Sequence, residues 1–166
     1  MLGYNEYGHP EFDTQRSPLG ELVYRLKYKS DKTAVPIIVG TIVEFMRGWA
    51  IEPETIVPLP PSKARSFQPV SEVAIGVSEA LGIPIDATTL KKSGTTPQMK
   101  DIGDYAERVK ALESVFVASK VLEGKQVLLL DDLYQSGASM NVAAVALKKQ
   151  AGVKAVYALA LTRTRS

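Results

Sequence analysis

The chain of 166 residues contains no cysteine and a single histidine, His9. The lack of cysteine excludes disulfides, a thiol nucleophile and any cysteine-based zinc or iron–sulfur site. One imidazole cannot build a multi-histidine metal centre. The longest apolar runs, 35–43 and 142–147, are far shorter than the roughly 18 residues that indicate a membrane span. Any chemistry must therefore use carboxylates, hydroxyls, lysines, arginines and backbone amides.

A large charge of one sign is also missing, because 20 basic and 18 acidic side chains leave a formal charge of +2. This balance gives no reason to expect strong direct binding of nucleic acid. The first residues are polar and lack the apolar stretch of a secretory signal, so we expect a cytoplasmic protein without membrane association. The length suits one domain covering residues 1–166.

Hydrophobic periodicity predicts alternating helices and strands after an irregular arm of about sixteen residues. Residues 1–50 are interpreted as this arm and a helical cover, and residues 51–166 as an α/β core. The expected helices are 18–29, 33–46, 70–81 and 138–150, and the expected strands are 55–57, 85–90, 115–118, 127–130 and 153–161. This pattern predicts a twisted parallel sheet with helices on both faces. Ligands bind such sheets at the carboxyl ends of the strands.

Two adjacent carboxylates, Asp131 and Asp132, follow the predicted buried strand 127–130. Neighbouring carboxylates at the edge of a sheet repel each other and lose hydration, so hydroxyls, a cation or a metal must offset their charge. The turn after them carries Ser136, Gly137 and Ser139 and leads into a helix. Backbone amides at a helix N-terminus form a cradle for phosphate, and glycine allows close approach. A ribose 5-phosphate would suit both features, because its hydroxyls can bind the acidic pair and its phosphate can bind the turn.

The segment Leu128–Ser139 resembles the 5-phosphoribosyl-1-pyrophosphate (PRPP) motif of the type I phosphoribosyltransferases. The resemblance implies that the acidic pair contacts the ribose 2′ and 3′ hydroxyls while the turn holds the 5′-phosphate. The family usually has two threonines where Gln135 and Ser136 stand here. The residues implied for ribose and phosphate are Asp131, Asp132, Gln135, Ser136, Gly137, Ala138 and Ser139.

Two further segments resemble loops of the same family, in particular its ComF-like branch. The first follows the strand 55–57, and the resemblance implies pyrophosphate binding by Pro61, Ser62, Lys63 and Arg65. Lysine and arginine supply the cations that pyrophosphate needs. The second, 91–108, resembles the flexible catalytic loop through Thr96, Gln98, Lys100 and Arg108. In the family this loop closes over the substrate and excludes water.

The resemblance, which extends over about residues 18–164, implies a Mg²⁺-dependent phosphoribosyltransferase. It would transfer ribose 5-phosphate from PRPP to a small-molecule acceptor, expected to be a nitrogenous base, with Asp131, Asp132 and Arg108 in the catalytic set. Mg²⁺ would be held mainly by PRPP rather than by side chains. Residues 18–29 resemble the amino-terminal helix of the ComF-like branch, although the cysteine-rich zinc module of many relatives is missing. The family is commonly dimeric, which makes a homodimer an expectation as well.

Other interpretations of these segments stay open. The acidic pair could be two solvated aspartates in an ordinary strand-to-helix turn, and the two loops could be a proline-rich turn and a surface hairpin. A receiver-type phosphorylation site also has paired aspartates after an apolar strand, but there that strand comes first in the domain. A pocket of this kind could also serve a non-catalytic PRPP- or nucleotide-binding regulator, or a competence-type partner protein.

Overall fold

The computed structural model describes residues 3–4, 10–11, 16–61, 67–93, 106–107, 109 and 115–164. Its labelled elements are β1 (Gly3–Tyr4), β2 (Pro10–Glu11), α1 (Pro18–Lys29), α2 (Ala34–Gly48), β3 (Thr55–Pro58), α3 (Pro69–Leu81), β4 (Leu90–Lys92), β5 (Phe116–Ala118), the 3₁₀ helix η2 (Lys120–Leu122), β6 (Gln126–Tyr134), α5 (Ala138–Lys149) and β7 (Ala155–Arg163). Where the arm was expected to be irregular, β1 and β2 form a short antiparallel pair. No helix in these ranges is long and apolar enough to cross a membrane.

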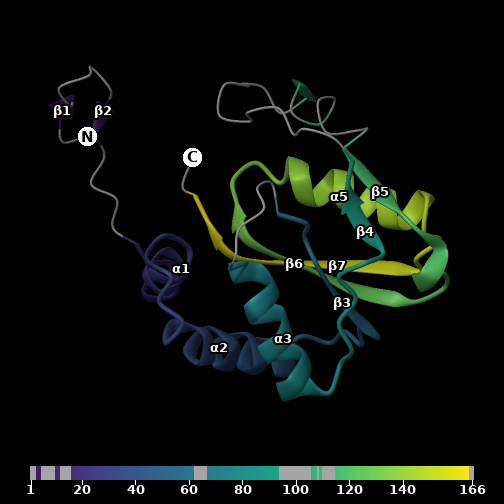
Figure 1. The fold of residues 1–166 in the computed structure, drawn as a ribbon, viewed down its shortest axis with the longest axis horizontal. Coiled ribbons are helices and arrows are strands. Elements are labelled where there is room, and N and C mark those ends of the chain that lie inside the picture. Colours follow the sequence, from purple (N-terminus) through teal and green to yellow (C-terminus); the bar gives the residue numbers. More distant parts are fainter. Residues whose placement is uncertain are drawn as a thin grey trace.

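The centre of the molecule is a parallel sheet with the strand order β3–β6–β7 (Figure 1). Ile85 adds one parallel bridge to Ile56 at the β3 edge. The middle strand β6 is apolar from Val127 to Leu130, and all four of these residues are 0% exposed. A strand that is buried on both faces has no polar alternation, which is why the continuous apolar run correctly predicted a parallel sheet.

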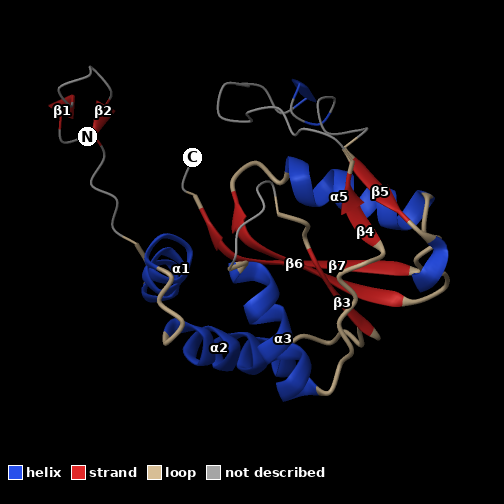
Figure 2. Ribbon diagram, viewed as in Figure 1, coloured by secondary structure: helices blue, strands red, loops and turns tan. Residues whose placement is uncertain are grey.

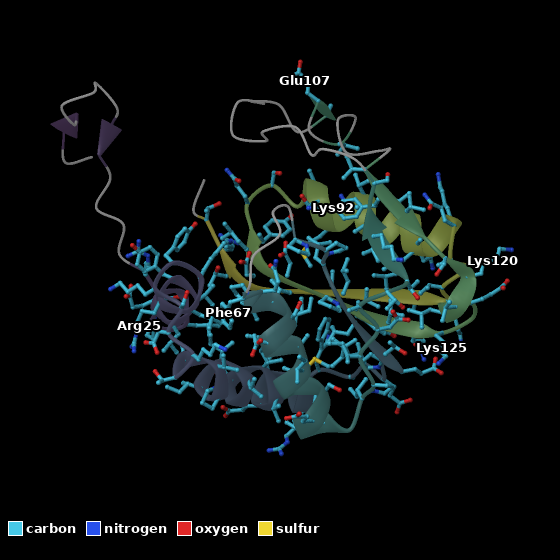
Figure 3. All side chains as sticks on the ribbon, viewed as in Figure 1. Arg25, Phe67, Lys92, Glu107, Lys120 and Lys125 are labelled. Atoms are coloured by element: carbon cyan, nitrogen blue, oxygen red, sulfur yellow. The ribbon has the colours of Figure 1, made fainter. Side chains whose placement is uncertain are left out.

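Helices cover both faces of the sheet (Figure 2). On one face, α5 packs with β4 and β5 over Val127 and Leu129. On the other face, α1, α2 and α3 pack over Leu128 and Leu130. Side chains fill both of these layers (Figure 3). The expected fold class, an α/β protein with a parallel sheet between helices, is confirmed.

The prediction of a strand over residues 85–90 is wrong. The Asp86 carboxylate accepts hydrogen bonds from the backbone amides of Thr88 and Thr89 at 2.7 and 2.8 Å, and from both threonine hydroxyls. These bonds hold a turn that interrupts the apolar run. The strand β4 begins only at Leu90, and it pairs antiparallel with β5 outside the parallel sheet.

Helix α1 begins as its sequence predicts. The Ser17 hydroxyl accepts a hydrogen bond from the amide of Gly20 at 3.1 Å, and Pro18 occupies the first helical position. Val23 and Leu26 are the buried residues of the helix. Since α1 contacts β7 as well as α2, its cap fixes one end of a helix that borders the carboxyl end of the sheet.

Replacing Ser17 by alanine should lower the free energy of unfolding by about 1 kcal/mol, because one helix N-terminal amide loses its partner. Urea unfolding followed by circular dichroism measures the change. Ser119→Ala is the matched control, since Ser119 is exposed and precedes η2 without a side-chain capping bond. Equal losses in the two variants would contradict a capping role for Ser17.

Candidate functional site

The candidate site exists because β6 is longer than its neighbour β3. The last β3 residue, Pro58, pairs with Leu130, and the amide of Leu59 donates to the Leu130 carbonyl at 2.8 Å. Beyond this point β6 continues to Tyr134 against β7 alone. The acidic pair was expected to follow the strand but lies within it. The β3 side of Asp131 and Asp132 therefore borders an open cleft instead of another strand.

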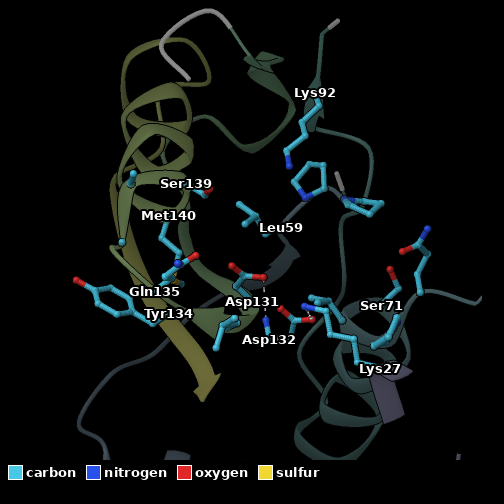
Figure 4. A pocket seen from close by; sticks show the side chains of 18 of the residues that line it. Lys27, Leu59, Ser71, Lys92, Asp131, Asp132, Tyr134, Gln135, Ser139 and Met140 are labelled. Carbon is cyan, nitrogen blue, oxygen red and sulfur yellow. Dashed lines mark hydrogen bonds and ion pairs between the residues drawn. The ribbon is translucent and has the colours of Figure 1, made fainter. Parts of the chain in front are cut away.

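This cleft has a volume of about 470 Å³ and collects residues from α1, α3, β4, β6 and α5 (Figure 4). Eight of the residues singled out by sequence line it together: Pro61, Asp131, Asp132, Gln135, Ser136, Gly137, Ala138 and Ser139. The other predicted residues of the two loops lie outside the described residues: Ser62, Lys63, Arg65, Thr96, Gln98, Lys100 and Arg108. Their roles stay predictions.

The two carboxylates leave the strand in different directions, because successive side chains of a strand alternate between its faces. Asp132 points towards α1, where its Oδ2 lies 2.6 Å from the Lys27 Nζ (Figure 4). The Asp132 residue is only 9% exposed, and the Thr162 hydroxyl donates to its carbonyl at 2.9 Å. The carboxylate is thus held in the wall of the cleft and does not point into bulk solvent.

Asp131 faces the interior of the cleft, on the side of Leu59 and Lys92 (Figure 4). Burial, followed by the negative charge of Asp132, raises the pKa of Asp131 to about 6. The positive charges of Lys27 and Lys92 act in the opposite direction. Burial also lowers the pKa of Lys92, while the charge of Asp131 raises it. The negative charge of Asp131 is therefore costly until a ligand or cation offsets it.

The turn between β6 and α5 has a left-handed residue at its tightest point. Gly137 has a φ of 76° and is the N-cap of α5. A Cβ atom at this position would lie 2.6 Å from the Tyr134 hydroxyl oxygen and 2.7 and 2.8 Å from two of its ring carbons. The conformation therefore favours glycine, and a larger residue would also force the exposed Tyr134 side chain to move. The first amides of α5, which have no partner within the helix, follow directly and line the cleft with Ser139.

A second helix also begins at the cleft. Pro69 is the first residue of α3, and Gln68 and Ser71 line the cleft beside it. Helix N-termini carry partial positive charge and unpaired amides, so two of them at one cleft favour an anionic ligand. The proline-rich segment Leu59–Pro61 lies between β3 and this helix and forms part of the wall.

Sequence reasoning missed the basic residues that complete the site. Lys27 comes from the last turn of α1, beside Tyr28, and Lys92 ends β4. The resemblance of residues 18–29 to a family helix included Lys27 but assigned it no role in the site, and a lysine at a helix end also fits the helix dipole. Lys120 and Lys125 look equivalent by composition, yet they lie at the opposite end of the sheet (Figure 3).

Neither a protein-family model nor a curated protein matches this sequence. Among solved structures, glutamine PRPP amidotransferase from B. subtilis is 23% identical with a TM-score of 0.52, and the match covers 76% of this chain. The chain spans only 26% of the length of that enzyme. Adenine phosphoribosyltransferase from Thermoanaerobacter pseudethanolicus is 15% identical with a TM-score of 0.52, covering 82% of this chain and 84% of that one.

The chain has the type I phosphoribosyltransferase fold. A hypothetical protein from Neisseria gonorrhoeae with bound ppGpp shares it, at 15% identity and a TM-score of 0.52 over 81% of this chain and 70% of that one. At these identities the likeness concerns the fold alone, since one fold can carry many functions. In this phosphoribosyltransferase fold, the acidic pair and the glycine turn lie at the carboxyl end of the middle strand, where α/β sheets bind ligands.

Proposed function

We propose that the protein is a Mg²⁺-dependent phosphoribosyltransferase that transfers ribose 5-phosphate from PRPP to a nitrogenous base and releases pyrophosphate. The observation that carries the proposal is one cleft that contains both Asp131–Asp132 and the Gly137 turn at the start of α5. Solved structures with the same fold include a PRPP amidotransferase and an adenine phosphoribosyltransferase, and this likeness supports the reaction class. The chain's resemblance to the ComF-like branch, through residues 18–29 and 57–65, supports the same class.

The cleft offers complementary groups to a sugar phosphate. Hydroxyls of a ribose donate to carboxylates, and a bond to a charged acceptor is stronger than one between neutral groups. Asp131 and Asp132 supply these acceptors, while the amides at the start of α5 and the hydroxyls of Ser136 and Ser139 donate to the 5′-phosphate. The exposed side chain of Gln135 stands at the rim of this turn.

Bond breaking at the anomeric carbon would generate positive charge on the ribose, and the acidic pair would stabilise that charge while it holds the sugar. A ring nitrogen of the acceptor would form the new bond to this carbon as pyrophosphate leaves with the electron pair of the broken bond. The N-terminus of α3 and the loop residues Ser62, Lys63 and Arg65 would bind the pyrophosphate. Arg108 and the loop residues Thr96, Gln98 and Lys100 would cover the reacting atoms.

We propose that the magnesium ion arrives on the ligand and is held mainly by PRPP. Mg²⁺ is commonly bound by substrate phosphates and water with few protein ligands. Bound to the oxygens of PRPP, the ion would offset the charge of the departing pyrophosphate. Asp132, which is paired with Lys27, is left to hold the ribose.

Calorimetry with PRPP and Mg²⁺, together with a pyrophosphate-release assay over a panel of bases, tests this function. We expect the wild type to bind PRPP and one base to give turnover. The double variant Asp131→Asn/Asp132→Asn should bind at least about 100-fold more weakly, which corresponds to about 2.7 kcal/mol. Glu44→Gln/Glu79→Gln removes the same charge at exposed positions on α2 and α3 and is the control. PRPP binding that is equal in all three proteins, or absent in all, would overturn the proposal.

A non-catalytic PRPP- or nucleotide-binding regulator is the second candidate. The family's usual pair of threonines is replaced by Gln135 and Ser136, and the side chain of Gln135 is exposed at the cleft. The structural neighbour from Neisseria gonorrhoeae is described with bound ppGpp. Tight binding of PRPP or ppGpp without pyrophosphate release over the base panel would favour the regulator. Pyrophosphate release that requires one base would favour the enzyme.

A cytoplasmic location and a homodimer also remain proposals. The near balance of charge supports a protein that does not bind nucleic acid strongly by itself. Fractionation of cells followed by immunoblotting tests the location, and light scattering of the purified protein tests the homodimer.

A further inference from the structure

Helix α1 contributes a charge to the cleft although it lies outside the strand-and-turn segment that defines the site. Lys27 sits next to Leu26, which is 1% exposed, so the backbone of α1 is fixed at this point by core packing. From there the Lys27 ammonium reaches Asp132 across the cleft wall at 2.6 Å. The side chains of the pair are 24% and 13% exposed. A pair this sheltered is screened far less than one on the surface.

The charges of the described cleft residues balance only if Lys27 is counted. Asp131 and Asp132 are the acidic residues in the described lining, and Lys27 and Lys92 are the basic ones. Without Lys27 the described lining would have an excess negative charge beside the phosphate-binding turn. Like charges in a partly dehydrated cleft repel, so a ligand with several phosphates would bind poorly there.

The geometry points to Lys27 as a positioning residue: it holds the Asp132 carboxylate towards the α1 side of the cleft and neutralises it, so that a ribose carrying phosphate groups can bind. This inference rests on the proposed function, because PRPP is the ligand that combines the diol with several phosphates. It assigns to the amino-terminal helix a direct part in the site. Lys27 acts through Asp132 and takes no part in bond breaking.

Variants at position 27 test the inference by calorimetry with Mg²⁺ and PRPP as the probe. Lys27→Met should weaken binding at least about tenfold, whereas Lys27→Arg, which keeps the charge, should stay within about threefold of wild type. Lys29→Met is the matched control, because Lys29 lies in the same last turn but is exposed and does not line the cleft. In a variant that already carries Asp132→Asn, the further change Lys27→Met should weaken PRPP binding by less than about twofold.

An unchanged affinity in Lys27→Met, or the same loss with and without Asp132, would overturn the role of Lys27. Thermal melting shows whether Lys27→Met is folded, and Lys27→Gln replaces it if it is not. If the wild-type protein does not bind PRPP, the proposed function fails. The effect of Lys27 on the acidic pair is then measured without any ligand.

That ligand-free measurement is a carbon NMR titration of the aspartate carboxyl groups. In the described structure, the charged groups that act on Asp131 and Asp132 are Lys27 from α1 and Lys92 from β4, and the two carboxylates also act on each other. Since the charge of Lys27 lowers the pKa of Asp131, Lys27→Met should raise that pKa above its value of about 6. Lys29→Met should leave it unchanged. A titration of Asp131 that is identical in wild type and Lys27→Met would refute the inference, whatever the outcome with PRPP.

Discussion

Replacing Asp131 by asparagine is expected to stabilise the protein at neutral pH and to weaken ligand binding at the same time. The pKa of Asp131 is about 6 in the folded protein and 3.8 in its ordinary state, chiefly because of burial. Between these values the folded protein binds a proton that the unfolded chain releases. The contribution of Asp131 to the free energy of unfolding therefore falls as the pH rises from about 4 to about 6, and stays low above.

Asparagine has no charge to bury, and its carbonyl oxygen can still accept the 2.8 Å hydrogen bond from the Asp132 amide. The variant should therefore be more stable than wild type by up to about 3 kcal/mol near pH 8 and by almost nothing near pH 4. Urea unfolding at the two pH values measures the difference. PRPP binding should fall about 10- to 100-fold, since a neutral acceptor replaces a charged one.

Glu79→Gln serves as the control for loss of an acidic side chain, because Glu79 is exposed on α3 and outside the cleft. Because this change removes no buried charge, its effect on stability should be small at both pH values. A stabilisation by Asp131→Asn that is equally large near pH 4 would show that burial of the charge is not its cause. Stability given up at a binding site in this way is typical of functional residues.

Gly137→Ala is expected to have the largest effect among single changes in the turn. The added Cβ atom would lie 2.6 Å from the Tyr134 hydroxyl oxygen and close to two ring carbons, at a φ of 76° that alanine rarely adopts. The Tyr134 side chain is 46% exposed and can rotate away from this atom, but the strain of the positive φ falls on the turn that presents the amides at the start of α5. We expect a loss of about 1–3 kcal/mol in the free energy of unfolding and at least about a 100-fold loss in PRPP affinity.

Gly124→Ala is the matched control for this strain. Gly124 has a nearly identical φ of 75°, but no atom lies within 4 Å of the added Cβ. This variant should lose about 1 kcal/mol of stability and bind PRPP like wild type. The double variant Gly137→Ala/Tyr134→Ala removes the clash but not the positive φ. If Gly137→Ala bound PRPP normally, the cradle assigned to this turn would be wrong.

The local structure around the cleft could be predicted from sequence because it is carried by short segments. The apolar run Val127–Leu130 predicted the buried middle strand, and Ala138 was correctly predicted as the start of a helix. The turn predicted between this strand and this helix is present, and the positive φ of Gly137 is a reason for glycine that the prediction did not contain. Each of these features depends on neighbours in the chain, so periodicity and turn chemistry were sufficient.

The strand expected at 85–90 shows where local patterns fail. Its apolar residues suggested pairing in the parallel sheet, but the bonds from Thr88 and Thr89 to Asp86 turn the chain after Ile85. Competition between a side-chain turn and a strand is decided by small energy differences. The sequence pattern does not reveal these energy differences.

By itself the sequence determined the acidic pair, the glycine turn, the apolar middle strand and an α/β architecture, because each follows from residues adjacent in the chain. Only the tertiary structure decided that β6 extends beyond the end of β3, which opens the cleft beside Asp131. It also decided that Lys27, more than a hundred positions before Asp132, is its ion-pair partner. The physical reason is that strand pairing and helix packing join distant segments, and lysine spacing within a single helix does not reveal which carboxylate the helix will meet.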